Sequence, residues 1–108
     1  MKTDLNRFLP LAPATLHILL ALAAEDLHGY GIMQEVQRQS EGRYRLGPGT
    51  LYDNLARLVR DRMVAETEQD ARRKYYRLTT TGRRVLAAEV ERLETVVRDA
   101  RALLPVRS

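Results

Sequence analysis

The sequence predicts a mainly α-helical fold with one small β-hairpin, arranged as a winged helix-turn-helix followed by a long C-terminal dimerisation helix. Three observations support this prediction. Three short segments with helical spacing of their apolar residues follow one another, separated by short polar connections. The residues then alternate with a period of two, as in β-strands, over a pair of short segments joined by a basic turn. The last segment carries a long apolar seam that ends beside a proline.

The composition is that of one folded domain with a modest core, since the chain has 108 residues of which 44% are hydrophobic. The absence of cysteine excludes disulfides, thiolate metal sites and cysteine nucleophiles. A net charge of +4 favours polyanionic partners, although many basic proteins bind none. The longest apolar stretch is too short to span a bilayer and the N-terminus lacks the pattern of a signal peptide, so we expect a cytoplasmic protein without a membrane partner.

The first predicted helix covers Pro13–Ala24, with proline at its start. It is apolar on most sides, which is typical of a helix at the centre of a fold or shared with a second subunit. Residues 1–6 before it are expected to fray. His17 lies within this helix, where a half-buried or surface histidine is favoured over a metal or catalytic role. A loop at residues 25–29 leads to a second predicted helix over residues 30–40.

The third predicted helix begins at Pro48 and runs to about Met63. One face of it carries the apolar residues Leu51, Leu55, Leu58 and Val59. The opposite face carries Thr50, Asp53, Arg57 and Arg60, with Asn54 at its edge. A plain surface helix has this pattern, and so does a recognition helix that enters the major groove of DNA. The neighbouring elements favour the recognition helix.

Two short strands, Val64–Glu68 and Tyr75–Leu78, are predicted on either side of a polar turn at Asp70–Arg73. One of Tyr75 and Tyr76 is expected in the core and the other at the surface, because they alternate across a strand. Three cations, Arg72, Arg73 and Lys74, stand at the tip of this hairpin. Such a run is often just a solvated turn, but its position after the third helix favours contact with DNA phosphates.

The C-terminal helix is predicted from about Thr80 to Leu104, with a side-chain cap from Thr79–Thr81 and a stop at Pro105. Its apolar seam recurs at spacings of four and three and consists of Leu86, Val90, Leu93, Val97, Ala100 and Leu104. The helix can fold back on its own domain or pair with a second copy. Homodimerisation is favoured because the seam is longer than a small domain can cover. We therefore divide the chain into a DNA-binding domain at residues 1–79 and a dimerisation helix at residues 80–108.

The sequence resembles the PadR family of transcriptional regulators in three motifs that occur in the family's order and spacing. They are Leu27–Ile32 (LHGYGI), Gly49–Leu58 (GTLYDNLARL) and Arg73–Gly82 (RKYYRLTTTG), within a resemblance that covers residues 17–86. The resemblance implies a dimeric winged-helix repressor of detoxification, efflux or stress genes, which binds a pseudo-palindromic double-stranded DNA operator and is released by a small molecule. We expect no cofactor.

The expected DNA-binding residues combine these motifs with the basic turn: His28, Tyr30, Gly49, Thr50, Tyr52, Asn54, Arg57, Arg72, Arg73 and Lys74. The resemblance also places Gly29 and Tyr76 in its patterns, and we attribute Gly29 to backbone conformation rather than to ligand approach. Tyr52 lies at the border of the apolar face, so the sequence fits two roles for it: a half-buried tyrosine that supports the wing, or one whose hydroxyl reaches a phosphate. Asp53 and Arg62 depart from the family pattern, and Arg62 stands where a helix end needs a positive φ.

Two other classes of function were considered. An enzyme is excluded because two isolated histidines, no phosphate-binding glycine loop and no buried carboxylate pair leave no catalytic residue or metal site to name. A winged helix that binds only protein remains the alternative, and the basic wing and the Arg57 face argue against it. The family's compact members can hold a small apolar effector at the dimer interface. The residues expected to line such a pocket here are Phe8, Leu9, Leu11, Leu93 and Val97.

Overall fold

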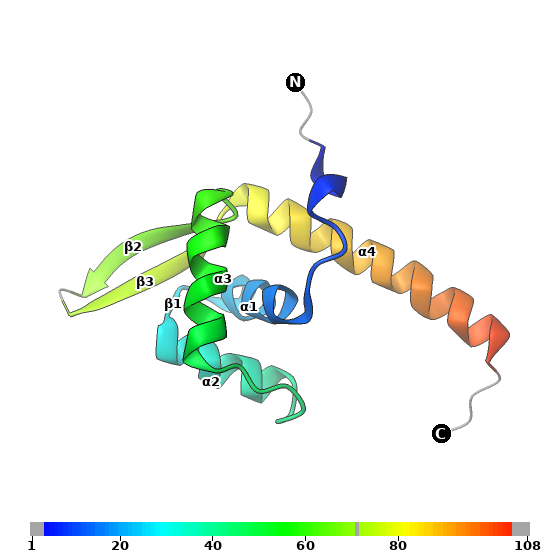
Figure 1. Cartoon of the computed structure of the whole chain (residues 1–108), viewed down its shortest axis with the longest axis horizontal. Helices are drawn as coiled ribbons and strands as arrows, with labels where there is room; N and C mark the ends of the chain where they lie inside the picture. Colours follow the sequence, from blue (N-terminus) through cyan, green and yellow to red (C-terminus); the bar gives the residue numbers. More distant parts are fainter. Residues whose placement is uncertain (1–3, 71, 105–108) are drawn as a thin grey trace.

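The computed structural model describes residues 4–70 and 72–104 of the chain and confirms the predicted fold class (Figure 1). Met1–Thr3 of the expected frayed segment and the expected helix stop at Pro105 lie outside the described residues. The elements in chain order are the 3-10 helix η1 (Leu5–Phe8), α1 (Pro13–Ala24), β1 (Leu27–His28), α2 (Gly29–Gln39), α3 (Pro48–Arg60), β2 (Val64–Asp70), β3 (Arg73–Leu78) and α4 (Thr80–Leu103).

Two short elements correct the sequence prediction. A 3-10 turn, η1, occupies Leu5–Phe8, where part of the segment was expected to fray. The carboxylate of Asp4 caps this turn by accepting a hydrogen bond from the Asn6 N–H at 3.0 Å. Strand β1 occupies Leu27–His28, where a loop was expected. Because β1 pairs with β3, the beginning of α2 lies beside the hairpin.

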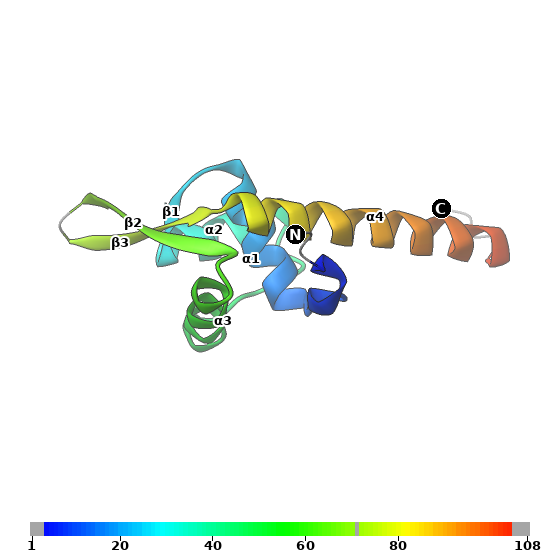
Figure 2. The same cartoon turned by 90° about the horizontal axis from the view of Figure 1, so that it is seen from above.

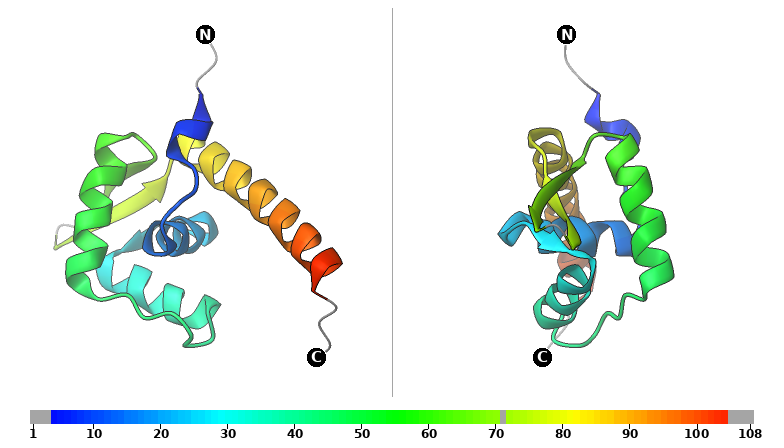
Figure 3. Two further views of the ribbon diagram at one scale, coloured as in Figure 1. Left: turned by 45° about the vertical axis from the view of Figure 1, so that its right-hand side comes forward. Right: turned by 90° about the vertical axis from the view of Figure 1, so that its left-hand side faces the viewer.

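Helix α1 lies at the centre of the molecule and packs against α2, α3, α4 and β3, as its apolar girth predicts (Figures 1 and 3). Ile18, Leu19 and Ala21 on this helix are fully buried. The buried cluster also contains Leu51, Leu55 and Leu58 from α3, and Val85 and Leu86 from the beginning of α4. The apolar face of α3 is therefore what seats it on the core. No helix among the described residues is long and apolar enough to cross a bilayer.

The three strands form one antiparallel sheet in the order β1-β3-β2. In register, His28 of β1 faces Tyr75 of β3, and Val64 of β2 faces Leu78. Tyr76 is buried while Tyr75 is only half-buried, which confirms that the two tyrosines alternate. The β2–β3 hairpin extends away from the helices (Figures 1 and 2).

The end of α3 turns directly into β2 through a residue with a positive φ. Arg62 has φ 63°, as its place after the helix predicted. Its N–H donates to the Val59 carbonyl at 3.0 Å. The Met63 N–H donates to the Leu58 carbonyl, also at 3.0 Å, so the two bonds form a Schellman-type helix end. The Thr79 hydroxyl donates to the Arg62 carbonyl at 2.7 Å and ties this turn to the beginning of α4.

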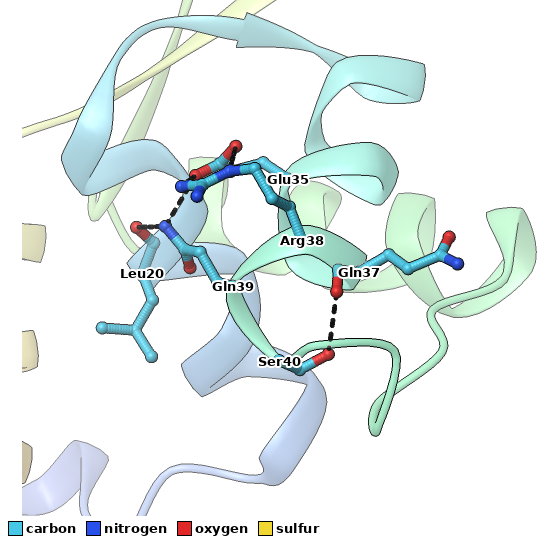
Figure 4. A network of polar contacts seen from close by, with 6 residues as sticks. All are labelled: Leu20, Glu35, Gln37, Arg38, Gln39 and Ser40. Carbon is cyan, nitrogen blue, oxygen red and sulfur yellow. Dashed lines mark hydrogen bonds and ion pairs between the residues drawn. The ribbon is translucent and has the colours of Figure 1, made fainter.

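The outer side of α2 is polar, and its end is joined to α1 (Figure 4). Arg38 forms an ion pair with Glu35 one turn earlier. The side-chain amide of Gln39 donates to the Leu20 carbonyl of α1 at 3.2 Å and to the Glu35 carboxylate at 3.0 Å. These contacts fix the direction of α2 and so of its first turn, which faces the hairpin.

Helix α4 binds the segment before α1 through a buried carboxylate. Glu89 is 1% exposed and accepts a hydrogen bond from the Leu11 N–H at 2.9 Å. It also accepts two from the guanidinium of Arg92, at 2.6 Å and 3.1 Å. The hydrogen bond from Arg92, opposed by burial and helped by the Leu11 N–H, lowers the pKa of Glu89. The C-terminal half of α4 projects away from the rest of the molecule (Figures 1 and 2).

Candidate nucleic-acid interface

The exposed side of α3 carries the polar residues that its amphipathic pattern predicted. Thr50, Tyr52, Asp53, Arg57 and Arg60 are exposed, as is Gly49 in the first turn. Pro48 begins the helix and Gly47 precedes it without a side-chain cap, so backbone N–H groups of the first turn have no side-chain partner. A helix with this arrangement presents donors along its first two turns to whatever lies in front of it.

The placement of Asn54 at the edge of the exposed face is wrong. Its side chain is buried, with 7% of the residue exposed. The amide oxygen accepts a hydrogen bond from the Thr15 hydroxyl of α1 at 2.6 Å. The amide nitrogen donates to the Thr50 carbonyl one turn earlier at 2.8 Å. Asn54 thus joins α3 to α1 and does not lie on the surface that would face a groove.

Tyr52 and Gly29 form a close contact between α3 and the beginning of α2. Gly29 has no positive φ, so the attribution to backbone conformation is wrong. A Cβ at Gly29 would overlap the hydroxyl of Tyr52, so a residue without a side chain lets the phenol lie against α2. Tyr52 remains 49% exposed on its other side. No local pattern indicates this contact, because the two residues belong to different helices.

The three cations of the hairpin tip, Arg72, Arg73 and Lys74, are exposed. Lys74 lies 3.4 Å from the carboxylate of Glu66 on the neighbouring strand. Farther along β3, Arg77 forms an ion pair with Asp26 at 2.9 Å. Both pairs are partly exposed, so they orient side chains more than they stabilise the fold.

One cleft brings together the beginning of α2, the first half of α3 and the hairpin. It has a volume of about 430 Å³ and is lined by His28, Gly29, Tyr30, Tyr52, Arg72, Arg73, Lys74 and Tyr76. Burial, and then the charge of Glu66, raises the pKa of Tyr76, so its phenol stays neutral. Among the described residues, the lining of the cleft combines aromatic rings with a cationic rim, and the carboxylate of Glu66 lies 3.4 Å from Lys74 of that rim. Such a surface suits a phosphate backbone.

The remaining expected DNA-binding residues lie outside this cleft. Gly49, Thr50 and Arg57 lie along the exposed side of α3, and Asn54 lies beneath it. Arg57 instead borders a second cavity of about 240 Å³ between α1, α3 and the segment before α1. The structure thus assembles the wing and the first turn of α2 into one site, beside an exposed helix face.

The residues expected to line an effector pocket are divided among different surfaces. Phe8 and Leu11 line the 240 Å³ cavity, together with residues of α3. Leu9 lines a separate groove of about 450 Å³ against α4. Leu93 and Val97 line neither of these cavities within one chain. Among the described residues, no group of three or more histidines and acidic residues is placed to hold a metal ion.

Comparison with known proteins identifies one consistent set of relatives. A model of the transcriptional regulator PadR-like family matches residues 18–88. The transcriptional regulator Rv3488 of Mycobacterium tuberculosis is 37% identical over 91 residues, which are 82% of each chain. An uncharacterised transposon protein of Streptomyces fradiae is 41% identical, but this chain spans only 21% of its length. The structure of a PadR family transcription regulator from Clostridium difficile superimposes with a TM-score of 0.71 over 85% of this chain and 98% of that regulator's chain. The two sequences are 24% identical, so this likeness shows a shared fold.

Proposed function

We propose that this chain, which belongs to the PadR-like family of transcriptional regulators, binds a pseudo-palindromic DNA operator as a homodimer and represses transcription there. Family membership makes it a transcriptional regulator rather than an enzyme. In this proposal residues 1–79 contact DNA, and residues 80–108 hold two copies together. The two symmetric modules would then read two half-sites of one operator.

The single observation that carries the proposal is the cleft between α2, α3 and the hairpin. It gathers Arg72, Arg73 and Lys74 beside the exposed face of α3, so that wing cations and helix donors approach one partner from adjacent positions. We assign phosphate contacts to the wing, because its long cationic side chains are exposed at the turn and at the beginning of β3. We assign base contacts to Thr50 and Arg57, because they project from a helix seated on the core.

The proposed dimer uses the apolar seam of α4. Leu86 is covered by the core of its own chain, but Val90, Val97 and Leu104 are 41%, 48% and 57% exposed. The C-terminal half of α4 extends away from the rest of the molecule (Figure 1). Apolar surface of this extent on a long helix is stabilised when a second helix covers it.

Substitution within the seam tests the dimer. Leu93→Arg and Val97→Arg each place a charge in the seam, where an unpaired ion costs several kcal/mol on burial. We expect both variants to sediment as monomers at concentrations where the unchanged protein is a dimer. Val97 is 48% exposed in one chain, so its variant separates loss of dimer from loss of fold. Thr95→Arg, on the opposite exposed face of α4, is the control and should stay dimeric. Dimers with Arg at position 97 and unchanged dissociation would contradict this interface.

Selection of bound duplexes from a random pool tests the DNA-binding function and its symmetry. We expect two inverted half-sites whose centres are separated by about one helical turn of 10 base pairs or a multiple of it. Enrichment of a single asymmetric site would contradict the dimeric operator. Absence of any enriched duplex, with binding lost at raised salt, would favour the alternative of a winged helix that binds only protein.

Release of the operator by a small apolar molecule is the regulatory part of the proposal. The 240 Å³ cavity supports it, because its apolar walls from Phe8 and Leu11 adjoin Arg57 on α3. An effector acts only if it binds DNA-competent and incompetent conformations with different affinity. Ligands that bind at this cavity should therefore weaken the operator complex. Ligands that bind there and leave operator affinity unaltered would exclude this cavity as the sensor.

A further inference from the structure

One ring nitrogen of His28 has a structural role as a hydrogen-bond acceptor. His28 caps α2, and its Nδ1 accepts a hydrogen bond from the Gly31 N–H at 3.1 Å. A nitrogen that accepts cannot carry a proton, so the proton of the ring stands on Nε2. The ring is held in this orientation by an edge contact with Tyr75, at 5.3 Å between centroids, and by the pairing of β1 with β3. His28 therefore directs a donor, not an acceptor, toward the hairpin.

Arg73 directs a second donor at the same point. Its Nη1 lies 2.8 Å from His28 Nε2. A guanidinium has donors only, so with the Nδ1 cap in place both nitrogens direct N–H groups to this point, and the roles in the contact follow the tautomer of His28. Both residues line the cleft described above, where Lys74 and Tyr52 stand nearby. An oxygen atom lying beside both nitrogens would accept from each of them and resolve the conflict.

We propose that His28 and Arg73 form one two-donor clamp that holds a single phosphate oxygen of the DNA backbone. The inference rests on the DNA-binding function proposed above and assigns a shared ligand to two residues from elements 45 positions apart. Phosphate oxygens are the acceptors that suit this pair, because they carry negative charge and the described lining of the cleft contributes three cations to meet it, Arg72, Arg73 and Lys74. The clamp would anchor the first turn of α2 and the wing to one phosphate and so set the register of α3.

A double-mutant cycle tests whether the two residues share one ligand. Asparagine at position 28 keeps a cap for the Gly31 N–H but cannot reach the position of Nε2, so His28→Asn removes the donor and spares the helix end. Arg73→Gln removes the charged guanidinium from an exposed strand position, and the shorter amide does not extend to the position of Nη1. We expect each variant to weaken binding of the selected duplex about 10-fold or more. The double variant should be weaker than the poorer single variant by no more than about threefold.

Replacement of individual backbone phosphates by uncharged methylphosphonates locates the shared contact. Methylphosphonate at one position should weaken binding by the unchanged protein and weaken binding by either single variant much less. Arg77→Gln is the matched control, because Arg77 lies on the same strand and pairs with Asp26 outside the cleft. It should remain sensitive to that position. Inorganic phosphate, compared with chloride at equal ionic strength, distinguishes a free anion from a DNA phosphate as the occupant.

The outcomes separate this inference from the proposed function. The clamp would be overturned, while DNA binding stands, if the loss of affinity in the double variant equalled the product of the two single losses. It would also be overturned if His28→Asn and Arg73→Gln changed the sensitivity to different phosphates. Displacement of DNA by inorganic phosphate that depends on His28 and Arg73 would assign the clamp to a free anion instead. Absence of any duplex binding by the unchanged protein would refute the proposed function itself. If His28→Asn fails to fold, the phosphate scan with Arg73→Gln alone still decides, because a clamp requires that variant to lose sensitivity at one position.

Discussion

Replacement of Glu89 by glutamine should destabilise the protein, because this carboxylate joins α4 to the segment before α1. Glu89 is 1% exposed and accepts three hydrogen bonds, one from the Leu11 N–H and two from Arg92. Glutamine keeps an oxygen for the Leu11 N–H but turns an amide donor toward Arg92. A lost charge-assisted hydrogen bond is worth about 1.5–3 kcal/mol. Arg92 is 39% exposed and can turn to water, so we expect a loss of about 2 kcal/mol in the free energy of unfolding.

The effect of Glu89→Gln should depend on pH in a direction that the pKa shift fixes. The hydrogen bonds from Arg92 and Leu11 lower the pKa of Glu89 in the folded state. The folded protein therefore binds this proton less readily than the unfolded chain, and the stabilisation is present above the ordinary glutamate pKa of about 4.3. It is lost as the pH falls through the lowered value of the folded state. The difference between the unchanged protein and the variant should be full at neutral pH and shrink in acid.

Urea unfolding at fixed protein concentration, measured at neutral pH and at a series of acidic values, tests this account. Glu94→Gln removes an exposed carboxylate from the same helix and serves as the control, with a change within about 0.5 kcal/mol. A Glu89→Gln variant as stable as the control at neutral pH would refute the argument from burial. A deficit that persists undiminished in acid would refute the argument from charge.

Two further predictions concern α3. Asn54→Ala should lower the free energy of unfolding by about 1–3 kcal/mol in urea titrations, because the buried Thr15 hydroxyl loses its acceptor. The DNA affinity of this variant, measured well below the unfolding temperature, should change little. A specific loss of operator affinity in a fully stable variant would contradict the buried placement. Arg62→Gly should raise the free energy of unfolding by about 1 kcal/mol, since glycine adopts the φ of 63° without steric cost. Ala56→Gly, at an exposed position inside the helix, should lower it by a similar amount in the same titrations.

Apolar periodicity was sufficient to predict the helices and the hairpin, because each depends on neighbours in sequence. Pro13 and Pro48 start α1 and α3 as expected, and the apolar face of α3 is the buried one. Strand β1 could not be predicted, since two residues carry no alternation and its pairing depends on β3. The positive φ at Arg62, by contrast, could be predicted, because a helix end is a local feature.

The candidate site was harder to predict because its contacts join distant residues. Asn54 was placed at the surface by its helical angle, but its partner Thr15 is 39 residues away. Gly29 looked like a backbone requirement, whereas the structure shows that Tyr52 needs the space. Glu89 has the appearance of a solvated helix residue until the Leu11 N–H is placed beside it. Such buried polar pairs leave no periodic signal.

The division of labour between wing and helix is tested most directly by binding isotherms at several salt concentrations, on the selected operator and on a scrambled duplex. Alanine at Arg72, Arg73 and Lys74 should weaken both duplexes alike and reduce the log–log salt slope by roughly 0.9 for each lost phosphate contact. Alanine at Thr50 or Arg57 should cost on the order of 1–3 kcal/mol on the operator and much less on the scrambled duplex. Loss of specificity in the wing variant, with only a general loss of affinity in the helix variants, would contradict the account.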